Sequence, residues 1–306
     1  MDAGLSASLA PRRGGGASSS DFKKAGAVPL RREMASLVFV APALVLLAGI
    51  LIWPLAKLIA LSFEDPQGPL VFYARLVTVP IYVQVLIRTL AFSTGTALIC
   101  FIAGYPVAYK LANARPVVRG VILICVLLPF WTNLLVRSYG WILVLNPKGI
   151  INQLLMGLGV INAPLNLVYN ITGILIGMSQ IMLPYMILPL YAVMTRLDPR
   201  ITRAARSLGA GPVATFAKVY FPLTMPGVMS GVLLVFTISL GFFVIPALLG
   251  GSHGLMIAQL IEFNINRSLN WGMASALSAS LLAVTLSLYW VGDRFLHLGA
   301  IWGIKR

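Results

Sequence analysis

The segment LDPRITRAARSLGAGPVATFAKVYFPLTMPG, residues 197–227, is basic, is punctuated by glycine and proline, and lies between two long apolar runs. Asp198 followed by Pro199 is typical of a helix start, because aspartate caps free N–H groups and proline fits the first helical position. This helix is expected to run to about Leu208 and to stop at Gly209, since glycine readily adopts the left-handed conformation that ends helices. The sequence therefore predicts a short charged helix outside the apolar runs.

A second short helix is expected after this turn. Gly211 and Pro212 restart the chain, and Pro222 and Pro226 are expected to break it again before the next apolar run. The segment would then consist of a short helix, a tight turn and a second short helix. Such a hairpin is suited to docking on a partner protein.

The first short helix would present a small apolar surface, Ala204, Ala205 and Leu208, among the arginines at 200, 203 and 206. Small side chains permit close approach to a groove in a partner, and the cations would steer the helix towards an acidic rim. An interfacial helix that rests on anionic lipid is the alternative interpretation.

Apolar runs on both sides of this segment are long enough to cross a bilayer. A helix rises about 1.5 Å per residue, so a hydrocarbon core of about 30 Å needs about 20 apolar residues. Six spans are expected: between Glu33 and Lys57, between Arg88 and Lys110, from Arg119 to Arg137, and at about 170–195, 223–249 and 271–291. The predicted fold class is an all-α membrane protein with six transmembrane helices.

Composition also places the chain among membrane proteins. Of the 306 residues, 59% are hydrophobic and 10% are charged, and the mean hydropathy is +0.91. The net charge of +15 would suggest a nucleic-acid partner for a soluble protein, but most of the 23 lysines and arginines lie in the tails and in the loops on one side of the expected bundle. The positive-inside rule then predicts that both termini are cytoplasmic, and it explains the charge without nucleic acid.

Three regions are expected along the chain. Residues 1–33 contain PRRGGGASSS and three basic pairs, and we expect a disordered cytoplasmic tail there. Residues 34–298 are expected to form one six-helix transmembrane domain with the docking loop at 196–222, and residues 299–306 a short cytoplasmic tail. The first apolar run is too long for a signal peptide and has no small-residue cleavage site, so we expect it to remain as an anchor.

The sequence lacks the residues that several kinds of catalysis need. Its eight acids fall in tails, in loops or at the ends of spans, whereas ion-coupled carriers usually place an ionisable group at mid-membrane depth. We find no phosphate-binding loop motif and no HExxH motif, and we expect Cys100 and Cys125 to be free thiols. We therefore expect no catalytic residue and no metal site, and an energy-coupled role would need a partner that hydrolyses ATP.

The docking segment also carries a family resemblance. Ala204, Ala205 and Gly209 are followed after nine residues by Val219-Tyr220-Phe221-Pro222, which resembles the EAA loop of ABC importer permeases, consensus E-A-A-x3-G-x9-I-x-L-P. The docking residues that the resemblance implies are Asp198, Arg203, Ala204, Ala205, Leu208, Gly209, Val219 and Pro222. Arg203 stands where the consensus has glutamate, which puts the details of the ATPase contact in question but not the fold.

Four more stretches are similar to the polyamine (spermidine/putrescine) branch of this family: LPFWTNLLVRSYGW at 128–141, residues 183–197, FPLTMPGV at 221–228 and VIPALLGG at 244–251. The resemblance implies a type I ABC importer permease of the bacterial inner membrane that carries spermidine or putrescine. It also implies an ATPase dimer that binds ATP and magnesium, a second permease subunit, and an extracytoplasmic solute-binding protein. Transport would proceed by alternating access, driven by closure of the ATPases.

The candidate substrate-path residues are Trp131, Asn133, Arg137 and Tyr139 at the outer end of the third span, with Phe242 and Phe243 in the fifth. Relatives often carry an acid near residues 242–243, whereas this chain has none. A polyamine would then depend on aromatic faces or on the second permease for charge compensation. Arg137 could instead snorkel to the outer interface or pair with a loop carbonyl, and the two phenylalanines could be ordinary packing residues.

Prolines and glycines in the spans predict local features of the helices. Four prolines are expected to bend or interrupt their spans: Pro129, Pro184, Pro189 and Pro246. Two GxxxG patterns, Gly173/Gly177 and Gly227/Gly231, predict close helix contacts.

Two alternatives remain open. Because no acid lines the expected path, the solute could be opine-like or amino-acid-like rather than a polyamine. An ion-coupled secondary carrier is the other alternative, and transport that persists without any ATPase would favour it. An intramembrane enzyme is disfavoured, because the sequence contains no catalytic constellation.

Overall fold

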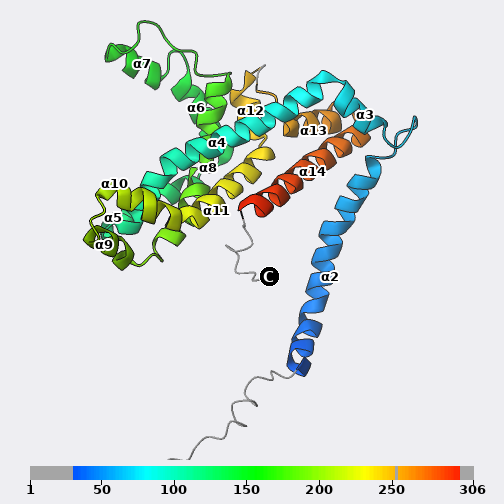
Figure 1. Ribbon diagram of the computed structural model, residues 1–306. Helices are drawn as coiled ribbons and strands as arrows, with labels where there is room; N and C mark the ends of the chain where they lie inside the picture. Colours follow the sequence, from blue (N-terminus) through cyan, green and yellow to red (C-terminus); the bar gives the residue numbers. More distant parts are fainter. Residues whose placement is uncertain (1–29, 252–253, 297–306) are drawn as a thin grey trace, which may run out of the picture. The chain divides into compact units, whose positions relative to one another are not determined.

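The structure is a computed structural model that describes residues 30–251 and 254–296 (Figure 1). The described residues form helices and connecting loops, with no strand among them. The chain divides between Lys57 and Leu58 into two compact units. Of the predicted tails, the structure describes only residues 30–33, which lie at the start of α2. The other tail residues lie outside the described residues.

The first unit consists of most of one long helix, α2 (Leu30–Leu61). It contains an apolar segment, Ala41–Leu61, that is long enough to cross a membrane. The large apolar side chains of that segment are exposed, among them Val45 and Trp53. A helix with such an apolar surface is suited to contact with lipid or with other membrane helices.

The second unit contains the remaining described helices (Figure 1). In chain order these are α3 (Val71–Thr78), α4 (Pro80–Asn113), α5 (Pro116–Leu127), η1 (Leu128–Trp131), α6 (Leu134–Leu145), α7 (Ile150–Gly157), α8 (Ile171–Met194), α9 (Pro199–Ser207), α10 (Pro212–Thr215), η2 (Phe216–Tyr220), α11 (Phe221–Leu240), α12 (Val244–Leu249), α13 (Ile257–Asn266) and α14 (Trp271–Leu296).

The core of this unit is the bundle of α4, α8 and α11, which lie side by side in Figure 1. Glycines let these helices approach closely. A Cβ on Gly231 of α11 would lie 2.7 Å from the Sδ atom of Met186 on α8, and a Cβ on Gly104 of α4 would lie 3.2 Å from the Cγ atom of the same residue. Met186 is fully buried between them. The predicted contact at Gly227/Gly231 therefore lies at the interface of α8 and α11.

A second, smaller apolar cluster joins α14 to α3, α4 and α13. Its buried members are Phe72, Val85, Ile257, Met273, Ala276 and Leu277. The hydroxyl of Thr89 on α4 donates to the carbonyl of Val85 and accepts from the backbone N–H of Ile257 at 2.9 Å. This buried hydroxyl fixes the start of α13 against α4, because both of its hydrogen bonds are removed from water.

Five of the predicted spans correspond to single helical stretches that are long and apolar enough to cross a membrane: Ala41–Leu61, Pro80–Asn113, Ile171–Met194, Pro212–Leu240 and Trp271–Trp290. A sixth span is obtained if the broken pair Pro116–Trp131 and Leu134–Gly157 is counted as one. Pro184 and Pro189 were predicted to bend or interrupt their span, and they lie inside the continuous helix α8, so they do not interrupt it.

The third span is broken next to Pro129, one of the prolines that were predicted to bend or interrupt their spans, and this prediction is confirmed. The chain bends by 104° at the break after Trp131. Pro129 lies in the tight turn η1 just before it, and the side chain of Asn133 then accepts a hydrogen bond from the N–H of Leu135 and caps a new helix. A proline followed by a cap residue therefore ends one helix and starts another within the apolar run.

The fifth span begins earlier and ends earlier than expected. Pro222 and Pro226 do not break the chain, because helix continues from Pro212 to Leu240. Just before Pro222 the helix widens into the π-turn η2, where the N–H of Phe221 donates to the carbonyl of Phe216. Such a widened turn can accommodate the missing N–H of a proline. The helix stops at Leu240, and α12 is a separate short helix rather than the end of the fifth span.

Candidate functional site

The docking segment begins with a well-formed cap. The carboxylate of Asp198 accepts a hydrogen bond of 2.8 Å from the N–H of Arg200, and Pro199 occupies the first helical position of α9. The helix ends at Ser207, and Gly209 has φ +86°, in the left-handed region. The start, the length and the glycine stop of this helix were all predicted from the sequence.

The outward surface of the segment is formed by side chains that the described part of this chain leaves uncovered. Leu208 is 88% exposed and Val213 is 79% exposed, and Arg203 and Ala204 are also exposed. Ala205 is half-buried, because α9 packs against α10 and η2. The two apolar side chains and the arginines together make an amphipathic surface that can bind a partner or a lipid surface.

The later residues of the motif connect the docking segment to the bundle. Val219 is half-buried in η2, and Pro222 is exposed at the start of α11. Gly211 and Pro212 start α10 as expected, and α10, η2 and α11 then form one continuous helical stretch. Because no loop separates the docking segment from this span, a displacement of α9 and α10 can be passed directly to α11.

An aromatic cluster couples the same segment to α4. The rings of Phe216 and Tyr105 lie 5.9 Å apart edge to face, and the rings of Tyr220 and Tyr109 lie 5.3 Å apart in the same arrangement. The hydroxyl groups of Tyr105 and Thr224 are hydrogen-bonded at 2.9 Å. The docking segment is therefore packed against two helices of the core bundle.

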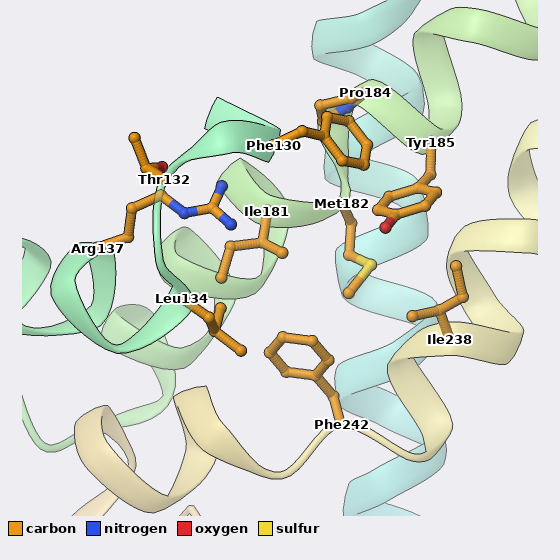
Figure 2. Close-up of a pocket in the computed structure, with 10 residues that line it drawn as sticks. All are labelled: Phe130, Thr132, Leu134, Arg137, Ile181, Met182, Pro184, Tyr185, Ile238 and Phe242. Atoms are coloured by element: carbon orange, nitrogen blue, oxygen red, sulfur yellow. The ribbon is translucent and has the colours of Figure 1, made fainter. Parts of the chain in front are cut away.

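A cavity of about 290 Å³ lies between η1, α6, α8 and the end of α11 (Figure 2). Its lining residues are Phe130, Thr132, Leu134, Arg137, Ile181, Met182, Pro184, Tyr185, Ile238 and Phe242. Figure 2 shows the guanidinium of Arg137 and the hydroxyl of Tyr185 directed into the space that these residues enclose. The cavity combines apolar and aromatic walls with a few polar groups, as sites for small solutes do.

Of the six predicted path residues, Arg137 and Phe242 line this cavity. The other four do not. Trp131 is 90% exposed, Tyr139 and Phe243 are exposed, and the side chain of Asn133 caps α6. The positions in the fold also differ from the prediction, because Arg137 and Tyr139 lie beyond the break, on α6, and Phe242 and Phe243 lie between α11 and α12.

The most prominent cavity residues that sequence reasoning missed are Phe130 and Tyr185, whose rings lie 5.1 Å apart. Tyr185 was difficult to find, because α8 is apolar on all sides and its pattern does not indicate which face borders a cavity. A signal for Phe130 was present, since it adjoins Pro129 at the break. The break itself brings η1 and α6 around the cavity.

Cys100 is buried on α4, where its thiol donates to the carbonyl of Ser179 at 3.3 Å, and Cys125 is exposed; neither forms a disulfide. In the part of the chain that the structure describes, no three His, Cys, Asp or Glu side chains come together as metal ligands.

Comparison with known families decides which interpretation of these features holds. Residues 34–297 match the family described as "Binding-protein-dependent transport system inner membrane component". The chain belongs to this family. It is therefore a multi-pass membrane permease subunit of an ABC transporter, of type I, and it is not itself an enzyme.

Individual relatives agree with this assignment. The permease is 36% identical to the spermidine/putrescine transport system permease protein PotB of Haemophilus influenzae over 255 residues, which cover 80% of this chain and 89% of that protein. It is 37% identical to PotB of Escherichia coli K12 over 228 residues, which cover 74% of this chain and 82% of that protein.

The fold also matches a solved transporter. A crystal structure of a bacterial alginate ABC transporter, in complex with its alginate pentasaccharide-bound periplasmic protein, contains a chain that superposes with a TM-score of 0.70. The match covers 87% of the permease and 94% of that chain at 16% identity. At this identity the likeness supports the shared fold and says nothing about the solute.

Proposed function

We propose that the permease carries a polyamine such as spermidine or putrescine into the bacterial cytoplasm. The observation that supports this most strongly is the similarity of 36–37% to spermidine/putrescine permeases over about three quarters of the chain or more. An opine-like or amino-acid-like solute is less favoured, because these relatives are spermidine/putrescine permeases. An ion-coupled carrier is less favoured, because the family is one of ABC transporters.

The energy would come from a separate ATPase dimer that binds ATP and magnesium. The docking segment Asp198–Pro222 would lie in a groove of that dimer, with Leu208 and Val213 as the apolar contacts and with Ala204 permitting close approach. Arg203 would meet the ATPase where the family consensus has glutamate, and we propose an altered salt bridge there. Both termini would then be cytoplasmic, in agreement with the distribution of basic residues.

The solute would pass through the cavity beside η1 and α6. The aromatic rings of Phe130, Tyr185 and Phe242 offer faces for ammonium groups, which gain about 0.5–2 kcal/mol from each such contact. A second permease subunit would complete the path, and an extracytoplasmic solute-binding protein would deliver the polyamine. Closure of the ATPases, transmitted through α9 and η2, would switch the access of this cavity from one side of the membrane to the other.

The proposal is tested by uptake of labelled solutes into proteoliposomes that contain the permease with its second subunit, its ATPase and its binding protein. We expect the vesicles to take up spermidine or putrescine only when ATP is present in the lumen, on the side where the ATPase subunits lie. An ATPase subunit with its catalytic glutamate replaced serves as the control. Uptake of amino acids or opines in place of polyamines would contradict the proposed solute, and uptake without ATP would contradict the proposed energy source.

A further inference from the structure

Arg137 has no charge partner among the residues that the structure describes. It lines the cavity, its Nε atom is buried, and that atom has no hydrogen-bond partner (Figure 2). Arg137 is half-buried, and its buried Nε–H group has no acceptor, which is unfavourable because desolvation of this donor is not offset by a hydrogen bond. The position of Arg137 therefore calls for an anion from outside the described part of this chain.

The depth of the cavity limits where that anion can come from. Met182 and Tyr185 lie in the middle part of the 24-residue helix α8, about 16 Å and about 14 Å from its nearer end. A phosphate group in the lipid headgroup layer is therefore too far away to meet Arg137. The partner must belong to a molecule that reaches the middle of the membrane.

The described part of this chain offers no carboxylate at that depth. The acids of the sequence are Asp2, Asp21, Glu33, Glu64, Asp65, Asp198, Glu262 and Asp293. None of the six acids that the structure describes lines the cavity. They lie in loops, at a helix cap, near the ends of α2 and α14, and on α13. The acid on α13, Glu262, already accepts a hydrogen bond from Asn266. A second copy of this chain has the same acids, so it offers no better partner than the first.

The solute is also the wrong partner if it is a polyamine, since its ammonium groups repel the guanidinium. This step rests on the proposed function. What remains is a different membrane subunit beside the cavity. Phe130 is 44% exposed and Thr132 is exposed, so the wall of the cavity reaches the surface of this chain, where such a subunit can approach.

We propose that Arg137 is the cationic half of an ion pair whose carboxylate belongs to a membrane-embedded Asp or Glu of a second, different permease subunit. In the resting complex the pair neutralises Arg137 and closes the cavity. An arriving polyamine presents ammonium groups to the same carboxylate and competes with Arg137 for it. The ion pair thus makes opening depend on a cationic solute, and it requires the two permease subunits to be different proteins.

The test uses the complete complex in proteoliposomes and replaces Arg137 by glutamine. Without the competing cation, the carboxylate is free in the absence of solute. We expect ATP hydrolysis without polyamine to rise by about 5-fold or more, which is the lower end of typical coupling between two sites. Arg267→Gln is the matched control, because Arg267 is exposed at the end of α13 and does not line the cavity. This control should leave hydrolysis unchanged.

A charge exchange identifies the partner residue. Each Asp or Glu in the predicted spans of the second subunit is replaced by its amide and by arginine, alone and together with Arg137→Glu. We expect one position at which the amide reproduces the effect of Arg137→Gln without adding to it, and at which arginine restores the coupling that Arg137→Glu destroys. Such a restoration excludes simple misfolding of the single variants.

Cross-linking makes the test independent of the solute. With Cys100 and Cys125 replaced, Arg137→Cys should form a disulfide with a cysteine placed at the identified acid in the resting complex. If the cross-link forms but no polyamine is transported, the ion pair stands and the proposed solute fails. Three results would each overturn the ion pair. The second subunit could have no acid in its spans, or every acid could give effects that add to those of Arg137→Gln. The third is an Arg137→Gln variant that hydrolyses ATP like Arg267→Gln.

Discussion

At the scale of single residues, the docking segment depends on one left-handed backbone conformation. Gly209 has φ +86°, which L-residues with a side chain adopt at a penalty of about 1–2 kcal/mol. No atom lies within 4 Å of the position where its Cβ would be. The requirement for glycine is therefore conformational and not steric, and it can be tested separately from crowding.

We expect Gly209→Ala to reduce solute-stimulated ATP hydrolysis severalfold, because the strained turn would displace Leu208 and the end of α9. Gly209→Asn should retain more activity than alanine, since asparagine tolerates the left-handed region. The matched control is Gly211→Ala, two residues later, where φ is −64° and the space for a Cβ is also open. Equal activity of the two alanine variants would contradict a role for this turn.

A second residue-scale prediction concerns the exposed side chain of Leu208. It is 88% exposed, so its replacement by serine should hardly change the stability of this chain. We expect Leu208→Ser to lower the yield of ATPase that copurifies with the permease. Leu158→Ser is the control, because Leu158 is also exposed but follows α7, in a different part of the chain. Unchanged copurification would mean that Leu208 does not contact the ATPase.

At the scale of helices, α8 and α11 approach so closely at Gly231 that no side chain fits at this position of α11. A Cβ on Gly231 would lie 2.7 Å from Sδ of Met186 and 3.2 Å from its carbonyl oxygen. We expect Gly231→Val to destabilise the permease by about 1–3 kcal/mol through overpacking. Its thermal unfolding midpoint in detergent should fall by about 2–4 °C for each kcal/mol.

Gly120→Val is the comparison for this change. Gly120 also lies in a helix interior, in α5, but no atom lies within 4 Å of its Cβ position. The same substitution should therefore leave the unfolding midpoint unchanged or raise it. A similar fall in both variants would indicate that valine acts through the helix backbone and not through the contact with α8.

The link between α4 and α11 yields another prediction at this scale. Tyr105→Phe removes the hydroxyl that is hydrogen-bonded to Thr224 and keeps the ring contact with Phe216. We expect a loss of stability of about 1 kcal/mol, together with weaker coupling of ATP hydrolysis to transport. Tyr109→Phe, one turn later on α4, keeps the ring contact with Tyr220 and should have a smaller effect on both measurements.

The helices also explain which features the sequence could predict. Capping is local, so Asp198, Pro199 and Gly209 were sufficient to predict the start and stop of α9. The π-turn before Pro222 was missed, because proline in isolation indicates a break and the widened turn that accommodates it has no signature of its own. The break after Trp131 was predicted from Pro129, but its angle of 104° was not, because hydropathy does not distinguish one straight span from two helices at an angle.

At the scale of the whole molecule, the apolar runs predicted the number of membrane-crossing stretches but not how they enclose a cavity. Arg137 and Phe242 were selected from the family resemblance, through the stretch at 128–141 and the position where relatives often carry an acid, and both line the cavity. Tyr185 and Ile238 could not be selected, because their position depends on how α8 and α11 pack against the broken third span. The composition of a helix that is apolar on every side carries no such information.

The most direct measurement is ATP hydrolysis by the complete complex, reconstituted from the permease, its second subunit and its ATPase, with and without solute-loaded binding protein. We expect an ATPase subunit to copurify with the permease and expect its hydrolysis to be stimulated by binding protein loaded with spermidine or putrescine, but not by the unloaded protein. Stimulation by another solute would retain the ABC permease and contradict the polyamine. Hydrolysis that is independent of the loaded binding protein would contradict coupling through the docking segment.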